Sequence, residues 1–107
     1  MSPASTIHVI SLDADLEKQM QNALVQTKTG LELQLAPSLR TRFLLALEQG
    51  LAWCHHEGYR KVVLLVDPQI RRQLRRVIER HFPHLSVLSY AEVAPGYSIN
   101  NLLSLSL

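Results

Sequence analysis

The chain has 107 residues, 47% hydrophobic and 19% charged, which predicts one folded domain with its own core and excludes a disordered chain. Its formal net charge is only +2, and its single cysteine, Cys54, excludes an internal disulfide and is typical of a reducing cytosol. No apolar run is long enough to span a membrane and no signal-peptide pattern opens the chain, so we expect a soluble domain without direct membrane contact.

The start of the chain predicts a short tail and then a strand. Residues 1–6 are expected to form a flexible tail or linker, and residues 7–107 a single α/β domain. Within this domain, residues 7–12 have the apolar, β-branched composition of a strand.

A helix and a second strand follow. Asp13 is expected to cap the helix, because its carboxylate can accept the free amides of the first turn. The core stripe of this helix is narrow and comprises Leu16, Met20, Ala23 and Leu24. After a polar turn at residues 26–30, residues 31–35 alternate between apolar and polar, which predicts a half-exposed strand at a sheet edge.

The longest predicted helix opens at Pro37 and Ser38, runs to about His56 and is closed by Gly58. Residues on one side of this helix recur at the spacing of a buried stripe. They are Leu39, Phe43, Ala46, Leu47, Gly50 and Cys54.

The same helix is more apolar than one buried stripe requires. Leu45 and Ala52 project opposite the stripe and Trp53 flanks it. One interpretation is that another helix of this domain covers these three residues. The other is that they pack against a neighbouring subdomain or subunit, which makes them candidate packing residues.

Residues 61–90 predict a right-handed βαβ crossover with two parallel strands. Residues 62–66 form a continuous apolar run, as expected for a strand covered on both faces. Asp-Pro at 67–68 is a helix-start signal, and Pro83 ends the helix before a strand at residues 85–88. The helix has a core stripe of Ile70, Leu74, Val77, Ile78 and Phe82.

The outer face of this helix is rich in arginine. Its arginines are Arg71, Arg72, Arg75, Arg76 and Arg80. A solvated basic face is one interpretation. The other is a docking surface for an acidic protein, with Arg72, Arg75 and Arg76 as candidate polar contacts; nucleic acid is less favoured, because no aromatic platform accompanies the arginines.

The chain closes with a turn at residues 94–96 and a strand at residues 99–107 in which leucine alternates with serine near the end. The whole sequence therefore predicts an α/β fold of about five strands and three helices, with the βαβ unit and a closing C-terminal strand.

The histidines do not predict a metal site. His55 and His56 are adjacent on a helix and point about 100° apart, so they cannot chelate one ion from the same face. His81 falls in the apolar stripe of its helix, where we expect a hydrogen-bonded, partly buried side chain. His84 follows Pro83, outside the helix, so the same-face spacing is lost.

Catalytic groups are not predicted either. Cys54 lies on the core side of its helix, which favours a buried, inert thiol. The carboxylates do not converge in pairs, and no glycine-rich phosphate motif occurs. We interpret the chain as non-enzymatic and expect no cofactor or metal.

Tyr90 and Glu92 follow the strand at residues 85–88 and admit two interpretations. Tyr90 can seat its ring on the sheet with its hydroxyl in water, which is a structural role. Alternatively, both residues mark a contact with another subdomain, which makes them a candidate strand-end contact.

Three parts of the sequence resemble one known family. They are the apolar run at 63–66, the arginine-rich helix ending at Phe82-Pro83 and, most specifically, the segment Val-Leu-Ser-Tyr-Ala-Glu-Val at 87–93. Together they resemble the end of the cytosolic domain of type III secretion export-gate proteins, the FlhA/SctV family (InvA-, YscV- and EscV-like). The resemblance covers residues 7–107 and implies the C-terminal subdomain of a much larger membrane protein.

The resemblance also implies a function. Family members form a homo-nonameric ring at the cytoplasmic face of the bacterial inner membrane, where the ring receives chaperone–substrate complexes and gatekeeper proteins and guides protein export. The segment at 87–93 favours a virulence-associated injectisome over a flagellar system. The alternative function is a stand-alone cytosolic α/β regulatory module that binds RNA or an acidic ligand through the arginine-rich helix.

Overall fold

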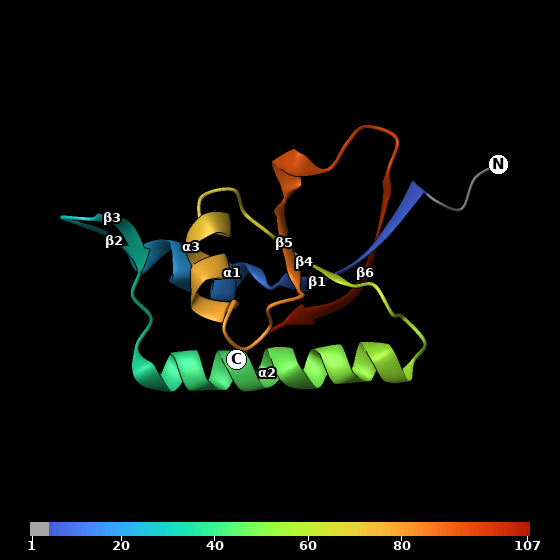
Figure 1. Cartoon of the computed structure of the whole chain (residues 1–107), viewed down its shortest axis with the longest axis horizontal. Coiled ribbons are helices and arrows are strands. Elements are labelled where there is room, and N and C mark those ends of the chain that lie inside the picture. Colours follow the sequence, from blue (N-terminus) through green and yellow to red (C-terminus); the bar gives the residue numbers. More distant parts are fainter. Residues whose placement is uncertain (1–4) are drawn as a thin grey trace.

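The structure, a computed structural model, describes residues 5–107 (Figure 1). The strands are β1 (Thr6–Leu12), β2 (Leu24–Thr27), β3 (Gly30–Leu33), β4 (Val63–Val66), β5 (Ser86–Ser89) and β6 (Ser98–Leu105). The helices are α1 (Ala14–Asn22), α2 (Pro37–His56), α3 (Arg71–Ile78) and the short 3₁₀ helix η2 (Tyr90–Glu92). The tail predicted for residues 1–6 lies largely outside the described residues, and Thr6 already belongs to β1.

Four strands form one parallel sheet in the order β5-β4-β1-β6. The predicted α/β class, the βαβ crossover from β4 through α3 to β5, and the closing strand β6 are therefore confirmed. β6 pairs with β1 through a register shift, so that Val9 faces Asn101 but Ile10 faces Leu103. The predicted strand at 99–107 ends earlier than expected, at Leu105, and Leu107 lies beyond β6 with 42% of its surface exposed.

β2 and β3 form a separate antiparallel hairpin, which projects from one end of the molecule (Figure 1). The sequence missed β2, because Ala23 and Leu24 continue the helical spacing of α1. In the structure Ala23 instead ends α1, and Gln34 donates its backbone N–H to the Ala23 carbonyl at 2.9 Å. The predicted turn at 26–30 is shortened to residues 28–29, and Gly30, the first residue of β3, adopts φ 123°.

The two faces of the parallel sheet are covered unequally. Alternate strand residues such as Ile10, Leu64 and Val66 join the buried side chains of α1, α2 and α3 in one core. The residues between them point to the other face, where Val9, Val63 and Leu65 form a smaller cluster without helical members. All three helices therefore contribute their core residues to one side of the sheet.

α2 lies along that side and is stabilised as predicted, with Pro37 at its start and Phe43, Leu47, Gly50 and Cys54 buried. Gly50 allows the helix to approach β6 closely, because a Cβ atom at this position would lie 3.2 Å from Cδ1 of Leu103.

Two local predictions around α3 were wrong. Asp67 and Pro68 open a turn, in which Asp67 accepts the Gln69 N–H at 2.8 Å, and α3 itself begins at Arg71. α3 also ends at Ile78, before His81, which leaves His81 exposed rather than partly buried. The predicted stripe is nevertheless inside, with Ile70, Leu74 and Ile78 fully buried.

Candidate functional site

The outward side of α2 carries exposed apolar side chains. Leu45 exposes 52% and Trp53 45% of their surface, and Ala52 is also exposed. No helix within residues 5–107 covers them, so the first of the two interpretations, burial by another helix of this domain, is excluded. Exposed Leu and Trp on one helix are typical of a surface that packs against another protein part.

The arginine-rich face of α3 divides into two groups. Arg72 and Arg76 are exposed. Arg75 instead donates from its guanidinium to the carbonyls of Leu85 and Pro83, so it is engaged within the domain. Of the three arginines predicted to make polar contacts, the structure therefore leaves Arg72 and Arg76 with free side chains.

Tyr90 belongs to a polar cluster at the carboxyl end of the sheet. Its hydroxyl donates to the Glu17 carboxylate, at 3.2 Å from each oxygen, and 47% of the residue is exposed. Glu17 also accepts the backbone N–H of Asp67 at 2.8 Å. Partial burial, followed by the nearby negative charge of Glu17, its hydrogen bond to the phenol and the charge of Asp67, raises the pKa of Tyr90 above its usual value.

Glu92 closes the same end of the sheet. Its carboxylate accepts the N–H of buried Ser89 at 2.8 Å, in a reciprocal capping box around η2. The same carboxylate oxygen lies 3.1 Å from Nε of Arg71, whose guanidinium also reaches the carbonyl of Val87 at 3.5 Å. The structure therefore gives both Tyr90 and Glu92 partners inside the domain, while the ring of Tyr90 remains half in solvent.

The cysteine and the histidines are not brought together. Cys54 is fully buried, and burial raises the pKa of its thiol, which disfavours the nucleophilic thiolate. Among residues 5–107, no group of three or more His, Cys, Asp or Glu side chains is placed to hold a metal ion. None of the helices in the same range has the length and apolar content that a bilayer crossing requires.

Comparison with known proteins identifies the family. The sequence matches the FHIPEP family over residues 1–98. The chain belongs to the FHIPEP family. The export-gate resemblance seen at residues 87–93 is thereby confirmed.

Curated members of the FHIPEP family match most of this chain. Protein MxiA of Shigella flexneri is 30% identical over 96 residues, and flagellar biosynthesis protein FlhA of Proteus mirabilis is 36% identical over 93 residues. These alignments cover 90% and 87% of the chain, but only 14% and 12% of the relatives. The chain thus spans about one seventh of the length of such FHIPEP proteins.

Solved structures of the family share its fold. The MxiA protein of Shigella flexneri superposes with a TM-score of 0.79 at 26% identity, covering 97% of this chain and 33% of that one. Nonameric EPEC SctV-C superposes with a TM-score of 0.82 at 23% identity, covering 97% and 30%. The complex of CdsV and CdsO from Chlamydia pneumoniae gives a TM-score of 0.76 at 29% identity, covering 95% and 30%.

Proposed function

We propose that this chain is the C-terminal subdomain of the cytosolic part of a type III secretion export gate, and that it contributes to a homo-nonameric ring at the cytoplasmic face of the inner membrane. The observation that carries the proposal is the FHIPEP match over residues 1–98, shared with proteins named for invasion and for flagellar biosynthesis. The nonameric assembly of SctV-C supports the ring. In this proposal the chain recognises partner proteins and shifts against its neighbouring subdomain, and it catalyses no reaction.

The outward side of α2 is the surface that packs on the neighbouring subdomain or subunit. Leu45, Ala52 and Trp53 supply the apolar contact, because their exposure leaves apolar area that burial would stabilise by about 25 cal/mol per Å². Tyr90 adds a half-exposed ring at the carboxyl end of the sheet as a second contact, and Glu92 caps the 3₁₀ helix on which Tyr90 lies.

Partner proteins contact the arginine-rich face of α3. Arg72 and Arg76 make polar contacts with acidic surfaces of neighbouring subunits, chaperone–substrate complexes or gatekeeper proteins. Arg75 meanwhile holds α3 against the segment that leads into β5. The complex of the related CdsV with CdsO supports the presence of a partner site in this family. The residue segment at 87–93 favours an injectisome.

A substitution on α2 tests the proposal. In the isolated chain, Leu45→Asp should change the free energy of unfolding by less than about 0.5 kcal/mol, because Leu45 is exposed. In the full-length protein the same change should reduce secretion strongly, since it buries a charge in the packing surface. Gln19→Asp, at an exposed position of α1 and so outside this surface, is the matched control and should leave secretion intact.

Light scattering provides the second readout. We expect this chain alone to be monomeric and to join a ring only when the upstream cytosolic region is restored. A loss of several kcal/mol in Leu45→Asp, or a stable small oligomer of the chain alone that the upstream region leaves unchanged, would contradict the proposal.

A further inference from the structure

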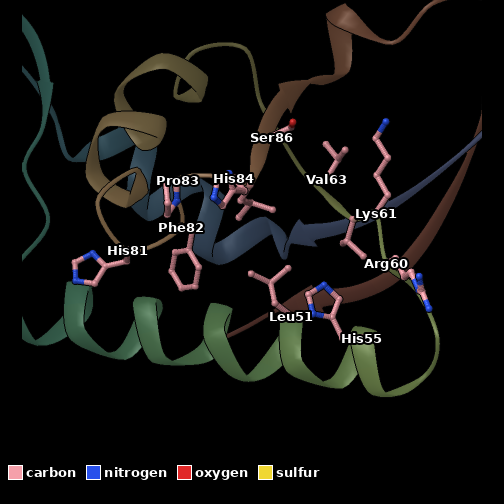
Figure 2. Close-up of a pocket in the computed structure, with 12 residues that line it drawn as sticks. Leu51, His55, Arg60, Lys61, Val63, His81, Phe82, Pro83, His84 and Ser86 are labelled. Carbon is pink, nitrogen blue, oxygen red and sulfur yellow. The ribbon is translucent and has the colours of Figure 1, made fainter.

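A cavity of about 380 Å³ opens between the C-terminal half of α2 and the amino ends of β4 and β5 (Figure 2). Three separate segments line it: α2 itself, the residues that lead into β4, and the turn that follows α3. This volume lies within the range of sites that enclose a small ligand or a bulky side chain.

The floor of the cavity is apolar. Val62 and Leu85 are buried there, and Leu51 and Phe82 are half-buried. Figure 2 shows Leu51 projecting from α2 toward the strands and Phe82 projecting from the turn toward α2. A single aromatic or aliphatic side chain inserted between them would remove this floor from water, which is the typical role of an anchor residue in an interface.

The rim of the cavity is basic. Every ionisable side chain that lines it is a histidine, an arginine or a lysine, and no carboxylate does so. These residues are His55, Arg60, Lys61, His81 and His84. The ion pair among residues 5–107 joins Arg71 to Glu92. Within this range Arg60 and Lys61 therefore have no acidic partner.

We propose that this cavity binds an acidic segment of a partner protein, which inserts one bulky apolar side chain between Leu51 and Phe82 and places its carboxylates against Arg60 and Lys61. The inference rests on the shape and charge of the cavity and is independent of the ring proposed above. A free inorganic anion would leave the apolar floor in water, and a nucleic acid would need exposed aromatic faces for stacking, whereas Phe82 is half-buried.

A second copy of this chain does not fit the cavity. Its acidic stretch, Asp13 to Glu17, has one large apolar residue, Leu16, and that side chain is only 2% exposed in the core. This stretch of a second copy therefore does not supply the acidic segment.

Three short peptides test the site by NMR titration of the amides around the cavity. The first is acetyl-Glu-Asp-Phe-Asp-Glu-amide, the second replaces its acids by Gln and Asn, and the third replaces its Phe by Ser. The first should bind at low salt about tenfold more tightly than either of the others, with shifts at His55, Phe82 and His84, and should weaken as salt screens the charges.

Matched charge variants separate this site from general attraction. Arg60→Gln/Lys61→Gln should weaken the first peptide about fivefold to tenfold, as expected for two exposed charge pairs. Lys18→Gln/Lys28→Gln removes the same charge from exposed positions of α1 and of the turn between β2 and β3, outside the cavity, and should change affinity less than about twofold.

Other results would overturn the inference. They are equal weakening by the two double variants, equal binding of the Phe and Ser peptides, and shifts that avoid the cavity. Tighter binding of single-stranded oligouridylate at these same amides would also overturn it, by assigning the cavity to nucleic acid.

Discussion

The two ends of the parallel sheet differ in how their charges are satisfied. At the carboxyl end, Glu17 bonds to Asp67 and Tyr90, so the polar groups that follow the strands are held by one another. At the amino end, Arg60 and Lys61 lie beside an apolar cavity without acidic partners. Open parallel sheets usually bind ligands at the carboxyl end.

In this protein the carboxyl end of the parallel sheet has a structural role. Its carboxylates connect α1, the end of β4 and η2, and therefore hold together segments that are far apart in the sequence. The unsatisfied charge is at the opposite end. Substitutions at the carboxyl end should therefore affect stability, and those at the amino end should affect binding.

The largest expected effect is at Glu17. Glu17→Ala removes the acceptor of the Asp67 N–H and of the Tyr90 hydroxyl, and should lower the free energy of unfolding by about 2 kcal/mol, as for a hydrogen bond to a charged group. Urea unfolding followed by circular dichroism measures the loss. Glu17→Gln retains an acceptor oxygen and should lose about half as much; a loss below about 0.5 kcal/mol in the Ala variant would remove the structural role of this end.

A smaller effect with a defined pH dependence is expected at Tyr90. The pKa of Tyr90 in the folded protein is raised above 10.0, the ordinary value for tyrosine. The hydrogen bond of Tyr90 therefore contributes fully to stability below pH 10, and this contribution is lost as the pH rises through the folded-state pKa. Tyr90→Phe should therefore cost about 0.5 kcal/mol at pH 8, and nothing once the phenol is ionised.

Absorbance titration of tyrosinate measures this directly. The difference between the natural protein and Tyr90→Phe should have its midpoint above pH 10, and Glu17→Gln should lower that midpoint because it removes the nearest negative charge. If the midpoint of Tyr90 is the same with Glu17 and with Gln at position 17, Glu17 does not raise the pKa of Tyr90.

The smallest effect on stability is expected at the amino end. Arg60→Gln/Lys61→Gln should change the free energy of unfolding by less than about 0.5 kcal/mol, because both side chains are exposed and lack partners. Thermal unfolding at moderate salt checks it. A loss above 1 kcal/mol would show that the rim of the cavity is structural, and the contrast between the two ends would disappear.

Elements with local signals could be predicted from the sequence. α2 and β4 were found because a proline start, a glycine end and an unbroken apolar run each act within a few neighbouring residues. The hairpin strand β2 was missed because Ala23 and Leu24 have helical spacing. In the structure the pairing of β2 with β3 and the hydrogen bond from the Gln34 N–H to the Ala23 carbonyl take these residues out of the helix.

The candidate site was predicted in part. Helical geometry placed Leu45 and Trp53 away from the stripe that ends at Cys54, but it left open whether another helix of the domain covers them; the structure leaves both exposed. Contacts between distant segments could not. Glu17 and Tyr90 are separated by 73 positions, and only the order of strands in the sheet brings them together.

Arg71 and Arg75 have a consequence for self-association. β5 is an outer strand of the sheet, and these two side chains donate one hydrogen bond to the carbonyl of Val87 in β5 and two to the carbonyls of Pro83 and Leu85 just before it. A foreign strand that added to β5 would have to displace them, so the guanidinium groups protect this border against aggregation by strand addition. Arginines that read as a docking surface in the sequence thus serve partly as a barrier to the wrong partner.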